Sequence, residues 1–148
     1  MTKRWIAAAG AALFLAACGG YGGGGGSTYM VPTPKATATP SGTPAQTAQI
    51  LGSAGFVSPN NFTLYEFGAD TAGVSNCSGA CAAVWPPFAA SATAQATGSF
   101  TIIMRADGIR QWAYKGHALY NFSGDARPGD AAGDGLNLNG GIWHVARP

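Results

Sequence analysis

The chain has few charged residues. Only 9% of its 148 residues are Asp, Glu, Lys or Arg, whereas about 25% is usual for a soluble domain. So few cations cannot form a basic stripe along a phosphate backbone, which excludes a protein that binds nucleic acid by neutralising it. The sequence also lacks a nucleophile elbow, a phosphate-binding loop and an HExxH motif, so the common catalytic motifs offer no assignment.

A long hydrophobic run is missing as well. The apolar residues 5–17 follow Lys3 and Arg4, and this stretch is shorter than the roughly 20 residues that span a bilayer. A cationic start and a short apolar run are typical of an export signal. The signal ends in Leu15-Ala16-Ala17-Cys18, which has the form of a bacterial lipobox. We therefore expect residues 1–17 to be a lipoprotein signal peptide and Cys18 to be lipidated.

The predicted anchor also defines the expected location. Removal of Lys3 and Arg4 with the signal cancels the formal net charge of +2, so attraction to anionic lipid does not hold the protein at a membrane. Two or three acyl chains on Cys18 give a stable anchor, whereas one chain binds only marginally. Gly19 stands where an Asp would favour retention at the inner membrane. We expect a bacterial cell-envelope lipoprotein, at the outer membrane or a membrane facing the periplasm.

The rest of the chain divides into a tether and a domain. Residues 18–48 are rich in Gly, Pro, Thr and Ser, a composition that predicts a disordered tether without a core. Residues 49–148 show short runs of β-branched and aromatic residues separated by turn signals, among them Asp107-Gly108, which predicts a type I′ hairpin turn. A short helix is expected at 77–84, before Pro86 and Pro87. The predicted fold is therefore all-β and mostly antiparallel, with strands at 62–67, 100–104, 109–114 and 118–122.

The domain contains an internal repeat. Leu64-Tyr65-Glu66-Phe67-Gly68-Ala69-Asp70 recurs as Leu119-Tyr120-Asn121-Phe122-Ser123-Gly124-Asp125, and a Trp follows each copy, Trp85 or Trp143. The repeats are expected at about 50–95 and 100–148, as two half-domains packed face to face. Strand alternation predicts a shared core formed by four aromatic side chains: Tyr65, Phe67, Tyr120 and Phe122.

These motifs carry a resemblance to a known family. The duplicated Tyr-x-aromatic-x-x-Asp motif, the stretch Cys77-Ser-Gly-Ala-Cys81 leading to Trp85-Pro86-Pro87, the strand Arg110-Gln-Trp-Ala-Tyr114 and the closing Gly141-Ile-Trp143-His-Val together resemble a bacterial family of secreted-repeat lipoproteins. The likeness covers about residues 50–148. It implies export and a repeated fold, but no activity, substrate or cofactor.

Cys77 and Cys81 are the two thiols left after lipidation of Cys18. An even pair in an oxidising compartment predicts a disulfide, and three intervening residues with Gly79 allow the required bend. A copper site with His117 or His144 is the alternative. Trp85 stands where a binuclear-copper loop would have His, and Ala82 stands where a copper chaperone of the thioredoxin-like class would have Pro. No cofactor is predicted.

The acidic residues suggest two further sites. Asp130 and Asp134 occupy positions of an EF-hand-like calcium loop that lacks two other oxygen donors, so carboxylates that cap their own turns are the favoured interpretation. Asp70 and Asp125 end the two motif copies. Each is expected to cap a turn or to pair with an arginine, Arg105, Arg110 or Arg127; the alternative is a pair of hydrolase carboxylates about 5 to 10 Å apart.

A candidate binding surface completes the set of site residues. It would be lined by tryptophans and arginines that could contact a sugar or a protein: Trp85, Trp112, Trp143, Arg105 and Arg110. The favoured alternative is that a domain of about 100 residues needs these aromatic rings for its core. The leading hypothesis is a non-catalytic structural or binding module of the envelope, whose partner is the membrane and an unidentified envelope protein or glycan. A redox or copper-handling protein using Cys77 and Cys81 is the alternative, and a carboxylate-dependent hydrolase is the third.

Overall fold

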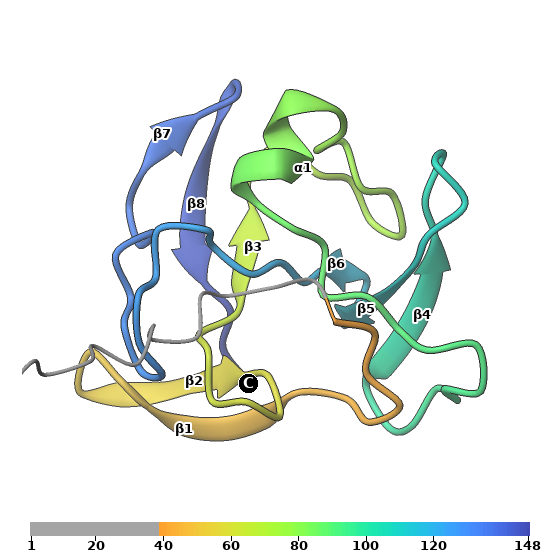
Figure 1. The fold of residues 1–148 in the computed structure, drawn as a ribbon, viewed down its shortest axis with the longest axis horizontal. Helices are drawn as coiled ribbons and strands as arrows, with labels where there is room; N and C mark the ends of the chain where they lie inside the picture. The colour runs from red at the N-terminus through yellow and green to blue at the C-terminus, as the bar shows by residue number, and fades with distance from the viewer. Residues whose placement is uncertain (1–38) are drawn as a thin grey trace, which may run out of the picture. The chain divides into compact units, whose positions relative to one another are not determined.

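The computed structural model describes residues 39–148. The predicted signal peptide, the lipidation site Cys18 and the tether as far as residue 38 lie outside the described residues. Within the described part the chain forms eight short strands and one helix (Figure 1): β1 (Gln46–Ile50), β2 (Ser53–Val57), β3 (Tyr65–Phe67), α1 (Ala80–Val84), β4 (Phe100–Met104), β5 (Arg110–Tyr114), β6 (His117–Ala118), β7 (Asn137–Leu138) and β8 (Gly141–Val145).

The strands form three small sheets. Strands β1 and β2 make a hairpin, β3, β8 and β7 make a second sheet, and β4, β5 and β6 make a third. Every pair of named strands is antiparallel. The predicted fold class is therefore confirmed: a mostly antiparallel β domain with one short helix.

Two-residue turns close several hairpins. The hairpin predicted at Asp107-Gly108 is present, between β4 and β5, but its predicted type I′ turn is wrong. Leu51 and Gly52 both have positive φ, 52° and 76°, as a type I′ turn requires. At Asp107-Gly108, only Gly108 has positive φ. The side chain of Asp107 accepts hydrogen bonds from the Ile109 N–H and from Arg105, which stabilises a wider turn.

The ordered chain begins earlier than composition predicts. Strand β1 begins at Gln46, inside the predicted tether, because it pairs with β2 along its whole length. Further upstream, the Ser41 N–H donates to the Ala89 carbonyl at 2.8 Å. The helix begins later than expected, at Ala80, because Gly79 has a positive φ of 55° that a helix does not allow.

The two repeats exchange segments. Strand β8 belongs to the second repeat but pairs with β3 of the first, so that Tyr65 lies opposite Val145. In the other half, Pro87 of the first repeat takes the same place opposite Tyr120 of the second. A proline has no N–H to donate, which explains why this segment forms isolated bridges in place of a regular strand.

Backbone hydrogen bonds repeat this exchange in both halves. Phe56 donates to Ala146, Ala146 to Leu64 and Leu64 to Phe56, at 2.8 to 2.9 Å. The second cycle has the same pattern, at 2.8 to 3.0 Å, and joins Trp112, Phe88 and Leu119. The expected face-to-face packing of two separate halves is therefore wrong, because each half contains the tryptophan-bearing end of the other repeat.

Candidate functional site

The duplicated motif forms two reciprocal contacts between the repeats. The Tyr65 hydroxyl donates to Asp125 Oδ2 at 2.8 Å, and the Tyr120 hydroxyl donates to Asp70 Oδ2 at 2.7 Å. The backbones of Tyr65 and Tyr120 also exchange both hydrogen bonds, at 2.8 and 2.9 Å. Each tyrosine is therefore bonded to the aspartate of the other copy, and we call these two pairs the clasps.

Burial determines the protonation of the clasps. It raises the pKa of Asp125 to about 6, although the hydrogen bond from Tyr65 favours the carboxylate. Burial also raises the pKa of Asp70, against the opposing effects of the Asn76 N–H, Tyr120 and Arg105. The tyrosine pKa values rise as well, mainly through burial, so both hydroxyls keep their protons and act as donors.

A column of four aromatic rings lies between the clasps. The centroid distances along it are 4.2 Å from Phe67 to Trp143, 3.8 Å from Trp143 to Trp85 and 4.3 Å from Trp85 to Phe122. The repeats alternate along the column. Tyr65 packs edge-on against Trp85, and Tyr120 packs edge-on against Trp143. The prediction that Tyr65, Phe67, Tyr120 and Phe122 share one core is confirmed.

The two tryptophans differ in one respect. The indole Nε1 of Trp143 donates to the Leu138 carbonyl at 3.3 Å. The buried Nε1 of Trp85 has no hydrogen-bond partner among residues 39–148. In the second repeat, strand β7 supplies the carbonyl that accepts from Trp143. In the first repeat, the segment before Trp85 is helix α1, and no carbonyl of the described residues accepts from Trp85.

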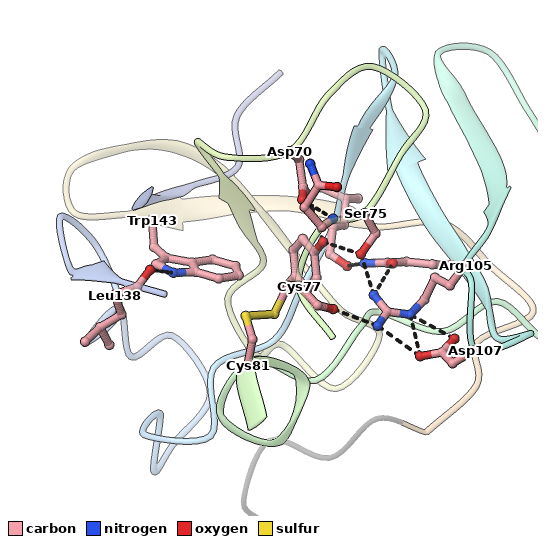
Figure 2. Close-up of a disulfide and its surroundings, with 12 residues drawn as sticks. Asp70, Ser75, Cys77, Cys81, Arg105, Asp107, Leu138 and Trp143 are labelled. Carbon is pink, nitrogen blue, oxygen red and sulfur yellow. Dashed lines mark hydrogen bonds and ion pairs between the residues drawn. A yellow bond between two sulfur atoms is a disulfide. The ribbon is translucent and has the colours of Figure 1, made fainter. Parts of the chain in front are cut away.

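Arg105 is the centre of a buried polar network that leads to one clasp (Figure 2). Only 5% of this residue is exposed. Its guanidinium bonds Asp107, Ser75, the Gln111 side chain and the Cys77 carbonyl, the last at 2.7 Å. Ser75 Oγ lies 2.6 Å from the Tyr120 hydroxyl, so the network is continuous from Asp107 to Asp70.

Cys77 and Cys81 form the predicted disulfide, which lies beside this network (Figure 2). Cys77 is completely buried and Cys81 is 8% exposed. Because the Cys77 carbonyl accepts from Arg105, the disulfide and the network position the same loop.

A model of a protein family matches the chain twice, over residues 55–89 and 101–147, and its description is "secreted repeat of unknown function". The chain belongs to this family of secreted repeats. The family predicted from the motifs is therefore confirmed, and it indicates a location outside the cytoplasm, in the envelope or beyond it. A search of curated proteins and a search of solved structures gave no match. Each of the two matched segments of this secreted-repeat protein includes its tryptophan-bearing end, which packs in the half of the domain formed by the other repeat.

Asp70 and Asp125 do not lie in a common open site. Asp125 has no exposed surface, and its other oxygen accepts from the Ala132 N–H at 3.0 Å. Asp70 accepts from the Asn76 N–H at 2.7 Å. A substrate therefore cannot reach Asp125 in this structure, and the predicted pairing of these carboxylates with arginines is wrong. Arg105 pairs with Asp107 instead.

The other charged candidates form separate contacts. Arg110 donates to the Ser91 and Ala94 carbonyls. Asp130 accepts from the Ala126 and Arg127 N–H groups, which agrees with the interpretation that it caps its own turn. For Asp134 that interpretation is wrong, because its carboxylate accepts from the Val145 N–H of strand β8.

The two histidines are exposed, and they lie in β6 and β8 as residues 117 and 144. Within residues 39–148, no three His, Cys, Asp or Glu side chains are grouped so that they could hold a metal ion. In the same part of the chain, no helix is long and apolar enough to cross a membrane.

The candidate surface of tryptophans and arginines is wrong. Trp85, Trp112 and Trp143 have no exposed surface, and Arg105 is buried. The reason is that a domain of this size needs its largest side chains for its core. None of these three rings can contact a ligand.

An open cleft of about 650 Å³ lies elsewhere. The segment 39–43 forms one wall, the loop 58–62 forms another, and Phe88 and Asn121 complete the lining. Sequence reasoning missed Asn121 because the two motif copies differ at this position, where the first copy has Glu66. It also missed Ser75 and Gln111, since no motif marks a polar residue that becomes buried around Arg105.

Proposed function

We propose that this protein is a lipid-anchored lipoprotein of the bacterial envelope, whose domain is a non-catalytic structural or binding module. The observation that carries the proposal is the reciprocal pairing of Tyr65 with Asp125 and of Tyr120 with Asp70. These duplicated polar side chains bond each other inside the domain. Their arrangement suits a rigid scaffold better than a site that must accept and release a substrate.

The anchor is argued from Cys18 and its surroundings. The lipobox sequence 15–18 precedes a Gly-rich segment, and membership of a secreted family agrees with export. The Cys77–Cys81 disulfide agrees with an oxidising compartment. In this proposal the lipid on Cys18 holds the domain at the outer membrane or at another membrane facing the periplasm.

The test compares the full-length protein with its Cys18→Ala variant in a bacterial host. We expect the wild-type protein in the membrane fraction, with diacylglycerol on the N-terminal peptide measured by mass spectrometry. The variant should lose both properties. The matched control is the Cys77→Ser/Cys81→Ser double variant, which keeps Cys18 and should remain acylated. An unacylated wild-type protein, or a Cys18→Ala variant that still carries diacylglycerol, would refute the anchor.

A further inference from the structure

The cleft beside Asn121 has a wall that is already fixed. Ser41 in the segment 39–43 bonds the Ala89 carbonyl and the Ser91 N–H through its backbone, at 2.8 and 2.9 Å. Its carbonyl also accepts from the Trp112 indole at 3.1 Å. These bonds hold the segment over the domain, so the cleft of about 650 Å³ does not require a ligand to form it. This volume is typical of pockets for small ligands.

Asn121 is the residue that points to a ligand. It lines the cleft and is only 3% exposed. Its backbone N–H donates to the Pro86 carbonyl at 2.8 Å, but its side-chain amide forms no hydrogen bond with any residue from 39 to 148. A primary amide has two donor hydrogens and a carbonyl acceptor. Because no hydrogen bond within residues 39–148 uses this amide and Asn121 lines the cleft, the amide can offer both a donor and an acceptor to an incoming molecule.

The remaining lining defines the chemistry of that molecule. The rings of Phe62 and Phe88 are buried and border the cleft, as do the hydroxyl-bearing Ser41 and Ser58. No charged side chain is among the described lining residues. A charged ligand would therefore find no counter-charge on these described residues, and a purely apolar ligand would leave the Asn121 amide unpaired.

An extended peptide fits this cleft less well than a compact ring. Peptides that add to a sheet use free backbone N–H and C=O groups along an edge. In the wall of the cleft, the N–H and carbonyl of Ser41 are already bonded to Ala89, Ser91 and Trp112. Recognition must then come from side chains, chiefly the Asn121 amide and the Ser58 hydroxyl. Phe62 and Phe88 are 4% and 2% exposed and leave little ring face for stacking, and the Ser41 hydroxyl already bonds Thr43.

We propose that this cleft binds a neutral, hydroxyl-bearing sugar unit, such as one residue of an envelope glycan, with Asn121 as the central hydrogen-bonding group. This inference rests on the proposed role of the domain as a binding module and names its ligand. It does not depend on lipidation of Cys18. The matching position of the first repeat, Glu66, carries a charge and lies opposite His144 in β8, so only one of the two repeats has this site.

The test is saturation-transfer NMR on the full-length protein in micelles of lauryldimethylamine oxide, a detergent without a sugar headgroup. The neutral probes are cellobiose and N,N′-diacetylchitobiose. Glucose 6-phosphate is the charged comparison, and N-acetyl-diglycine amide is the peptide comparison. We expect a neutral disaccharide to bind, and the two comparison compounds to show no transfer.

Three variants locate the site. Asn121→Ala should weaken binding by about tenfold, the cost of one lost hydrogen bond. Asn60→Trp changes an exposed residue that lines the cleft and should block binding without disturbing the core. Glu66→Ala, the matching position outside the cleft, should bind as the wild type does.

The proposal is overturned if neither disaccharide binds, if the peptide comparison binds in their place, or if Asn121→Ala and Asn60→Trp both bind as tightly as the wild type. Loss of sugar binding in a protein that is still acylated and membrane-bound would refute the site alone. Failure of acylation would refute the anchor without affecting the binding measurement.

Discussion

Tyr65 donates its hydroxyl proton to Asp125 across the junction of the two repeats, at an oxygen–oxygen distance of 2.8 Å, and Asp125 has no exposed surface. The partner clasp joins Tyr120 to Asp70 in the opposite direction. Both contacts connect residues that are far apart in sequence. Each clasp can therefore form only when the two repeats are assembled.

Removal of a clasp hydroxyl should destabilise the domain. Tyr65→Phe leaves the buried Asp125 without its side-chain partner, and we expect the free energy of unfolding to fall by about 1–3 kcal/mol. Tyr114→Phe is the matched control, because Tyr114 is only half-buried; it should change stability by less than about 0.5 kcal/mol. Urea unfolding measures both values, and equal losses in the two variants would contradict a special role for the clasp.

The stability of the domain should fall as pH rises from about 4 to about 6. The pKa of Asp125 is about 6 in the folded protein and about 3.9 in an unfolded chain. The folded state therefore holds a proton that the unfolded state releases in this range, and the loss amounts to about 3 kcal/mol. Burial also raises the pKa values of Asp70 and Glu66, so these groups lower stability over the same pH range. Arg105 lowers the pKa of Asp107, and the effect of that group on stability falls below this range.

Asp125→Asn tests that pH dependence. The amide does not titrate, so most of the decline between pH 4 and 6 should disappear in urea unfolding curves. Asp130→Asn removes a carboxylate from the same loop but keeps Asp125, and its stability should still decline, over a slightly lower pH range, because the charge of Asp130 contributes to the raised pKa of Asp125. A wild-type stability that stays level or rises over this range would show that Asp125 is ionised when folded.

The two tryptophans of the aromatic column should respond differently to replacement by phenylalanine. Trp143→Phe loses the hydrogen bond to Leu138, whereas Trp85→Phe removes an N–H group with no partner among the described residues. Both variants lose stacking area, but Trp85→Phe should be less destabilised, by about 1 kcal/mol. Thermal and urea unfolding would show this difference, and the reverse order would indicate that the Trp85 N–H has a bonding partner.

Removal of the disulfide should lower stability moderately. The loop between Cys77 and Cys81 is short, so the chain-entropy model assigns the bond about 2 kcal/mol. Cys77→Ser/Cys81→Ser should show this loss without reductant, and reductant should have a similar effect on the wild type. Adding reductant to the double variant serves as the control and should change nothing.

Features set by local sequence were predictable. The pairs of small turn residues, the aromatic runs and the spacing of Cys77 and Cys81 determine short strands, their hairpins and a disulfide without reference to distant segments. The turn at Asp107-Gly108 was mispredicted because Arg105 and the Ile109 N–H both bond the Asp107 side chain. A dipeptide rule does not include such a contact.

Features set by distant pairing were not predictable. The motif copies indicate that Tyr65 and Asp70 matter, but the sequence suggests turns or arginines as partners of the aspartates, whereas the actual partner of each is the tyrosine of the other copy. The burial of Trp85, Trp112 and Trp143 agrees with the favoured interpretation that the core needs these rings, but the alternation of the two repeats along the aromatic column was not predicted. Asn121 lines a cleft whose other wall is residues 39–43, which composition assigns to a tether.

The reciprocal clasps have a consequence for a chain with one repeat. Such a chain would hold one motif tyrosine and one motif aspartate, and both of their partners would be missing. Two copies of such a chain, related by a two-fold axis, would supply the missing partners. The tyrosine of each copy would then meet the aspartate of the other. In its bonding pattern, this domain is a symmetric dimer whose two subunits are joined in a single polypeptide.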